Sequence, residues 1–117
     1  MAVGYTGKII RSTNDGSSWD NVTAVNSNNL YGVSFGNSTF VAVGSGGAII
    51  RSTDNGSSWD DANSGTSEVL RGITFGNNIF LAVGDDGTIV KSDDNGSSWS
   101  SSSSGTTNDL NGVTFGD

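Results

Sequence analysis

The sequence contains no cysteine, no histidine and no proline. Without cysteine, the chain cannot form disulfides, thiolate nucleophiles or cysteine-based metal sites. Without histidine, it lacks the usual general base near neutral pH and the commonest metal ligand. These absences argue against most classes of enzyme and against the common zinc sites.

Basic residues and long apolar segments are also scarce. Five lysines and arginines stand against twelve aspartates and glutamates, which gives a net charge of −7 at pH 7. Such a surface repels phosphate backbones and anionic membrane surfaces. The apolar runs are far shorter than the ~20 residues that a membrane-spanning helix needs. We therefore expect neither nucleic acid nor a membrane as a partner.

The chain does have an internal repeat with a period of 40 residues, and repeats of this length are typical of stacked architectures. We treat residues 1–117 as a single repeat domain with copies at 1–40, 41–80 and 81–117. The close agreement between copies indicates either recent duplication or deliberate design. Three motifs recur in register: Ala-Val-Gly at 2–4, 42–44 and 82–84; Gly-Ser-Ser-Trp at 16–19, 56–59 and 96–99; and Leu-x-Gly-[Val/Ile]-[Ser/Thr]-Phe-Gly at 30–36, 70–76 and 110–116.

Each copy holds four short β-like segments separated by turn signals. In one copy they are predicted at 30–35, 40–43, 48–52 and 57–62. Valine, isoleucine, phenylalanine, threonine and tryptophan fill these segments, which suits a buried pleated sheet. Four antiparallel strands in ~40 residues are typical of a propeller blade. The predicted fold is an all-β β-propeller with three four-stranded blades per chain.

An eight-residue turn joins the third and fourth segments, and it reads Ser-Thr-Asp-Asn-Gly-Ser-Ser-Trp at 52–59. Its pattern, Ser-x-Asp-x-Gly-x-[Ser/Thr]-Trp, resembles the Asp-box, or BNR repeat. The blades look most like the Asp-box propellers related to photosystem II assembly factors, and sialidases and sortilin-type receptors carry the same box. The first copy departs from the pattern at Asn14. The box residues are Ser12, Asn14, Gly16, Trp19, Ser52, Asp54, Gly56, Trp59, Ser92, Asp94, Gly96 and Trp99.

We expect the box residues to be structural. Asp54 and Asp94 can accept hydrogen bonds from backbone N–H groups of their own turns. The glycines supply the positive φ of a hairpin turn, and Trp59 and Trp99 are predicted to pack against the neighbouring sheet. All three tryptophans, Trp19 included, are predicted to be structural. The resemblance likewise implies that the box is a folding element away from any active site. A calcium loop usually needs a bidentate glutamate, and the only one here, Glu68, lies in another loop. We predict no metal and no cofactor.

No set of residues has the pattern of a catalytic site. The sialidase resemblance implies an arginine cluster, but Arg11 and Arg51 share one repeat position with Lys91, which predicts an ordinary blade surface. The adjacent acidic pairs lie by turns and are predicted to be solvated rather than catalytic; they are Asp60–Asp61, Asp85–Asp86 and Asp93–Asp94. The serines lack an activating base. We expect a non-enzymatic protein.

One position that differs between the repeats follows the first-strand leucine. It is occupied by Tyr31, Arg71 and Asn111. If that strand is innermost, these side chains ring the mouth of a central channel. Two hypotheses follow. The chain is a self-assembling scaffold with no ligand of its own, or it is a recognition module that binds glycans or proteins through repeated rim pockets.

The assembly hypothesis rests on the offset of the repeats. Residues 1–4 align with the second strand of a blade, and residues 110–116 align with a first strand. The last segment of one chain can therefore pair with the first segment of the next. Three blades are too few for a ring, since propellers have typically four to eight. We expect a homodimer with six blades, and the alternative is a homotrimer with nine.

Overall fold

A computed structural model describes residues 1–116 and contains three antiparallel sheets. The first sheet has three strands and the other two have four each. The strands are β1 (Ala2–Val3), β2 (Ile9–Arg11), β3 (Asp20–Val22), β4 (Leu30–Gly36), β5 (Thr39–Gly44), β6 (Ile49–Ser52), β7 (Asp60–Ala62), β8 (Leu70–Gly76), β9 (Ile79–Gly84), β10 (Ile89–Ser92) and β11 (Ser100–Ser102). Short 3₁₀ turns follow the second strand of each repeat: η1 (Tyr5–Gly7), η2 (Ser45–Gly47) and η3 (Asp85–Gly87).

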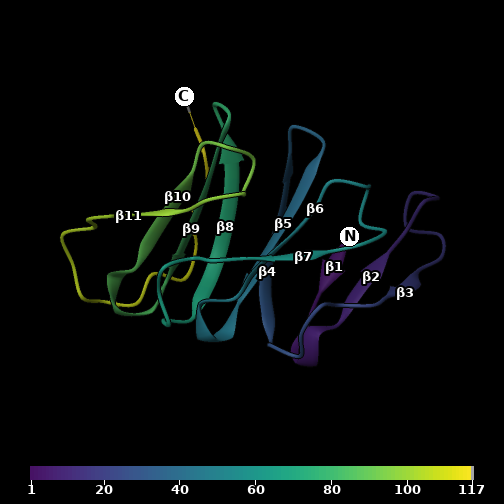
Figure 1. Ribbon diagram of the computed structural model, residues 1–117, viewed down its shortest axis with the longest axis horizontal. Helices are drawn as coiled ribbons and strands as arrows, with labels where there is room; N and C mark the ends of the chain where they lie inside the picture. The colour runs from purple at the N-terminus through teal and green to yellow at the C-terminus, as the bar shows by residue number, and fades with distance from the viewer. Residues whose placement is uncertain (117) are drawn as a thin grey trace.

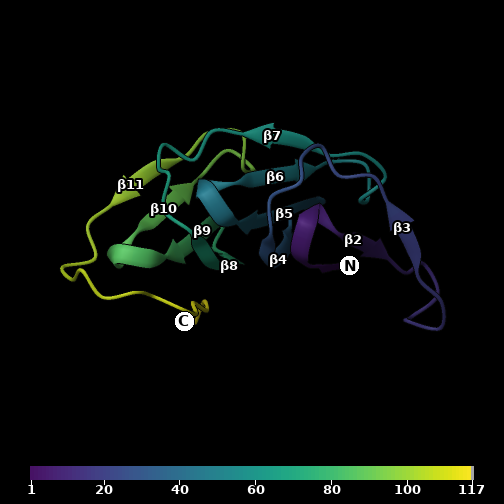
Figure 2. The same cartoon turned by 90° about the horizontal axis from the view of Figure 1, so that it is seen from below.

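The sheets lie side by side along the chain, as Figure 1 shows. Strand order within each sheet follows the sequence, so every connection inside a sheet is a hairpin. Seen from below in Figure 2, the outer strands β3, β7 and β11 line the convex border of an arc, and β4 and β8 lie on its inner side. This arrangement is that of propeller-like blades, which confirms the predicted all-β, blade-type architecture.

The cores lie between sheets rather than within one. Trp59 packs between the first and second sheets with Ile9 and Leu30. Val41 and Val43 of the second sheet pack with Phe80 of the third. Each blade buries its apolar faces only against a neighbouring blade, which explains why residues on both faces of the middle strands are apolar.

Glycines let the inner strands approach one another closely. A Cβ on Gly36 would overlap the ring of Phe75, and one on Gly76 would overlap the ring of Phe115. A Cβ on Gly72 would lie 3.4 Å from the backbone of Gly112. Segment 110–116 therefore lies against β8 as β8 lies against β4.

The inner hairpins carry a β-bulge at the same place in two blades. The register of β4 with β5 shifts between Leu30 and Gly32, and that of β8 with β9 shifts between Leu70 and Gly72. The residues left between the shifted pairs are Tyr31 and Arg71. Bulges of this kind re-aim a side chain and occur often beside binding sites.

The predicted strand bounds hold within a residue for the first three segments of a blade but not for the fourth. That strand was expected at 57–62, and the structure begins β7 at Asp60. Residues Ser57 to Trp59 belong to the preceding turn, where side-chain hydrogen bonds hold the backbone. Segment 110–116 was aligned with a first strand, yet it forms no strand ladder within residues 1–116.

Candidate functional site

The turn at 52–59, here named the tryptophan turn together with its equivalents at 12–19 and 92–99, closes on itself by side-chain hydrogen bonds. The Ser58 N–H donates to Asp54 Oδ1 at 2.9 Å, and the Gly56 N–H donates to Ser52 Oγ, also at 2.9 Å. Trp59 Nε1 donates to the Gly56 carbonyl at 3.3 Å. Asn55 and Gly56 both have positive φ, 61° and 80°, as the two central residues of a primed hairpin turn require.

The carboxylates of this turn are held in their charged form. Hydrogen bonds from the Ser58 side chain and N–H lower the pKa of Asp54 from 3.8 to about 2. The equivalent bonds from Ser98 lower the pKa of Asp94 to about 2 as well. A carboxylate that accepts several donors loses them when it is protonated, so the turn favours ionisation.

Asn14 preserves most of this geometry in the first turn. Its Oδ1 accepts the Ser18 N–H at 2.9 Å, as Asp54 does from Ser58. Its Nδ2 donates to Ser18 Oγ at 2.8 Å, so the serine hydroxyl here accepts a bond that it donates in the other turns. The first turn therefore keeps the same shape with a neutral amide in place of the carboxylate.

The second and third tryptophan turns are also held by an arginine from the preceding sheet. Arg11 Nη1 donates to the Asn55 carbonyl at 3.2 Å and to Ser57 Oγ at 2.7 Å. Arg51 Nε donates to the Asn95 carbonyl at 3.1 Å. The predicted surface position is repeated in two blades, and there the arginines also bridge adjacent blades. Lys91, at the same repeat position, has no hydrogen-bond partner within residues 1–116.

The three tryptophans differ in burial although their turns match. Trp59 is 3% exposed, Trp99 is half-buried and Trp19 is 46% exposed. Trp59 and Trp99 pack against a neighbouring sheet as expected, whereas Trp19, which was expected to be structural, is exposed within residues 1–116. A tryptophan packs against the sheet that precedes its own, and no described sheet precedes the first.

The two ends of the arc are therefore open. We name the surface around the first tryptophan turn, with exposed Asp15, Gly16 and Trp19, the head face. The opposite surface, the tail face, is the side of the third sheet around Leu81 and Lys91. It contains a cavity of about 220 Å³ that is also lined by Thr74, Gly76, Ile79 and Phe115.

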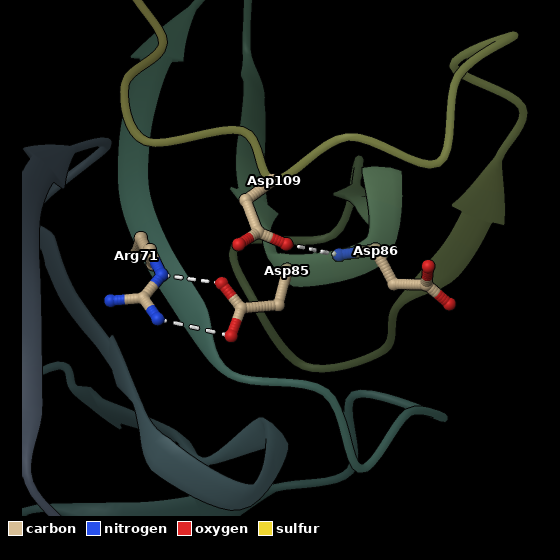
Figure 3. A network of polar contacts seen from close by, with 4 residues as sticks. All are labelled: Arg71, Asp85, Asp86 and Asp109. Carbon is tan, nitrogen blue, oxygen red and sulfur yellow. Dashed lines mark hydrogen bonds and ion pairs between the residues drawn. The ribbon is translucent and has the colours of Figure 1, made fainter.

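A polar cluster lies at the bulge of β8, close to the rim predicted from the sequence. Arg71 forms a two-pronged ion pair with Asp85 of η3: Nε donates to Oδ1, and Nη2 donates to Oδ2 at 3.0 Å. This pair lowers the pKa of Asp85 and raises that of Arg71. Figure 3 shows the neighbouring Asp109 carboxylate accepting the Asp86 N–H, at 2.9 Å, while the Asp86 side chain points away.

The structure brings two of the three predicted rim residues together. The Arg71 guanidinium lies 5.9 Å from the centre of the Tyr31 ring, within cation–π range. The exposed Asn111 makes no side-chain hydrogen bond within residues 1–116. Sequence reasoning missed Tyr5, whose ring lies 6.1 Å from that of Tyr31, and it took Asp85 for a solvated acid. Two repeat positions vary between the copies: one holds residues 31, 71 and 111, and the other holds residues 5, 45 and 85. Only a comparison of these two positions could have indicated the contacts.

Two further observations concern metals and membranes. Among residues 1–116, no three acidic side chains gather in a way that could hold a metal ion. No helix in that part of the chain is long and apolar enough to cross a membrane.

Comparison with known proteins identifies the fold. No family model matches the chain, and no curated protein matches it. A solved structure described as YCF48 bound to D1 peptide is similar, with a TM-score of 0.72 and 24% sequence identity. The match covers 85% of this chain and 35% of that one, so this chain spans about a third of that neighbour's length. The similarity shows a propeller-like fold.

Proposed function

We propose that this chain is a non-enzymatic scaffold of Asp-box blades that assembles with copies of itself into a closed β-propeller. The observation that carries the proposal is a pair of open strand edges. Segment 110–116 lies where an inner strand belongs but pairs with no strand among the described residues, and β1 pairs only with β2. Exposed edges of this kind readily pair with another chain.

The contacts of the last segment support its role as an inner strand. The Leu110 N–H donates to the Gly84 carbonyl at 2.9 Å, and the Leu30 N–H donates to the Gly4 carbonyl at the same distance. Leu30 begins β4, which pairs with β5. Val33 pairs with Ala42 in the second sheet. Their repeat equivalents are Val113 and Ala2, so the same register would pair Val113 of one copy with Ala2 of the next.

An aromatic contact at the inner strands supports the same junction. Phe75 packs on Gly36, and Phe115 packs on Gly76. Phe35 is 54% exposed, and nothing lies within 4 Å of a Cβ placed on Gly116. Gly116 of one copy would therefore receive Phe35 of the next, repeating a contact that the chain already makes twice.

Six blades from two copies fall within the usual range for propellers, and nine from three copies fall outside it. The head-to-tail contact forms a ring only when the rotation between copies closes. We therefore propose a homodimer, with the nine-bladed homotrimer as the alternative.

The absence of catalytic chemistry is part of the proposal. The aspartates with a lowered pKa, Asp54 and Asp94, are engaged by serines of their own turns, and Asp85 is engaged by Arg71. Catalytic acids and bases usually have a pKa moved toward the working pH, and these are moved away from it. This supports a structural role for the acidic residues.

Cross-linking tests the proposal directly, because the chain has no cysteine of its own. The double variant Ala2→Cys/Val113→Cys should form disulfides between copies under mild oxidation. The matched control, Val33→Cys/Ala42→Cys, places the same register within one chain and should form a disulfide without raising the mass. A closed dimer gives one band of two chains, and a closed trimer gives one of three. An open-ended ladder, or no cross-link where the control forms one, would contradict closure.

A second candidate function, recognition of a glycan or protein, is favoured by the rim cluster. Tyr5 and Tyr31 are 69% and 38% exposed and lie edge to face. Exposed aromatic rings beside an arginine offer stacking together with polar contacts. The similar solved structure contains a bound peptide, so peptides belong in the test besides glycans. A glycan and peptide array probed with the wild type and Tyr31→Ala would test it: binding that the variant loses supports the rim, and binding by neither contradicts it.

A further inference from the structure

We infer that the cavity of the tail face receives Trp19 of a second copy, and that Lys91 pairs with Asp15 across this junction. The inference rests on the proposed function, since it names the contacts that would hold two copies together. It also assigns roles to Trp19 and Lys91, whose counterparts are engaged elsewhere in the chain.

The first and second sheets each have a surface equivalent to the tail face, and within the chain the next blade covers both. Leu81 and Lys91 on the third sheet correspond to Val41 and Arg51 on the second. There the next tryptophan turn is seated: a Cβ on Gly96 would lie 3.0 Å from Val41 Cγ2, and Arg51 holds the Asn95 carbonyl. The half-buried Trp99 packs into the same apolar cluster as Val41.

The junction before it repeats the arrangement. Gly56 packs on Met1, Arg11 holds the Asn55 carbonyl, and Trp59 is buried among the residues of both sheets. Two junctions in one chain thus use the same three contacts. These contacts are a glycine on an apolar side chain, a basic side chain on the turn carbonyl, and a tryptophan between the sheets.

The head face contains the equivalent turn at 12–19, and no neighbouring sheet packs on it within residues 1–116. Asp15 and Gly16 have φ of 58° and 85°, close to the 61° and 80° of Asn55 and Gly56. The turn is therefore already shaped to present the Asp15 carbonyl. A Cβ on Gly16 would meet only the ring of Trp19, at 3.9 Å, whereas Gly56 and Gly96 are buried.

The junction between copies differs in sequence from the two internal junctions, and the residues that differ are complementary in charge. At the two internal junctions an arginine donates to the backbone carbonyl of an asparagine, Asn55 or Asn95. At the junction between copies Lys91 would face Asp15, so an acidic residue replaces the neutral one opposite the base. The apolar residue at the corresponding place on the tail face is Leu81, which lines the cavity of about 220 Å³. A second copy of this chain therefore fits both the shape and the charge of the tail face.

The consequences differ between the two contacts. A tryptophan that fills a pocket at the centre of an interface dominates its affinity, so Trp19→Ala should raise the dissociation constant at least ~30-fold for each junction. An exposed ion pair contributes less, so Lys91→Glu or Asp15→Lys should weaken assembly by a few-fold or more, and more strongly at low salt.

The decisive experiment is a charge exchange followed by sedimentation velocity over a range of concentrations. Lys91→Glu and Asp15→Lys should each weaken association, and the double variant should restore it to near the wild-type value. Lys8→Glu is the matched control, because exposed Lys8 follows η1, outside both faces, and gives the same change of charge. Circular dichroism would check that each variant keeps its β signal, and the exchange does not depend on Trp19→Ala folding.

The outcomes separate the two proposals. If the wild type associates but the exchange brings no rescue, or Trp19→Ala associates as tightly as the wild type, the junction described here is wrong and the scaffold proposal stands. If the wild type remains a single chain at every concentration, no copy covers the tail face, and both proposals fail.

Discussion

Replacing Trp59 by alanine tests whether the blades are held together by their tryptophans. The indole is 3% exposed and packs with Ile9, Leu30 and Phe40, the last at 6.4 Å between ring centres. Deleting a large buried aromatic costs about 3–5 kcal/mol, because the apolar contacts are lost and a cavity remains between two sheets. Since domains are stable by only ~5–15 kcal/mol, the variant should be severely destabilised.

Urea unfolding followed by circular dichroism measures this loss in the free energy of unfolding. All variants are compared at one protein concentration, because association also stabilises the folded state. Trp19→Ala is the matched control: its indole is 46% exposed, so below the association range it should cost less than ~1 kcal/mol. A loss under ~1 kcal/mol for Trp59→Ala, or equal losses for the two variants, would refute the assignment of Trp59 to the core between blades.

Three further outcomes are expected from stability measurements. The folded pKa of Asp54 and Asp94 is about 2, below the ordinary 3.8, so their contribution to stability should be complete above pH ~4 and lost as the pH falls toward 2; acid unfolding of the Asp54→Asn/Asp94→Asn variant should show less of this loss, and an unchanged profile would contradict it. Excess chelator should leave the Tm unchanged, whereas a fall restored by Ca²⁺ would overturn the structural reading of the turns. Gly36→Ala should cost about 1–3 kcal/mol because its methyl group meets the Phe75 ring, while Gly4→Ala, which within one chain has only an ordinary contact at 3.8 Å, is the tolerated control when measured below the association range; equal losses would count against the close packing of the inner strands.

The local structure of a blade could be predicted from the sequence because its signals are local. The turn residues at Gly36-Asn37 and Asn55-Gly56 mark hairpins, and β4, β5 and β6 begin and end within a residue of the predicted bounds. The start of the fourth strand could not be placed, since the bond from the Ser58 N–H to Asp54 and the bond from Trp59 to the Gly56 carbonyl extend the turn as far as Trp59.

The contacts between blades could not be predicted because they depend on which sheet lies next to which. Arg11 and Arg51 look like surface residues in a single blade, yet they hold the tryptophan turn of the following one. Trp19 has the same local sequence as Trp59 but lacks a preceding sheet within the described chain. At the rim, Arg71 meets Asp85 because a β-bulge and a 3₁₀ turn converge there, which no single repeat reveals.

Light scattering coupled to size exclusion tests the central claim, closure by copies of this chain, most directly. The chain has a mass of 11.9 kDa, so a six-bladed ring of two copies should elute with a constant mass of about 24 kDa across its peak. A constant mass of about 36 kDa would replace the dimer by the nine-bladed trimer. A stable species of 11.9 kDa at every concentration would contradict closure altogether.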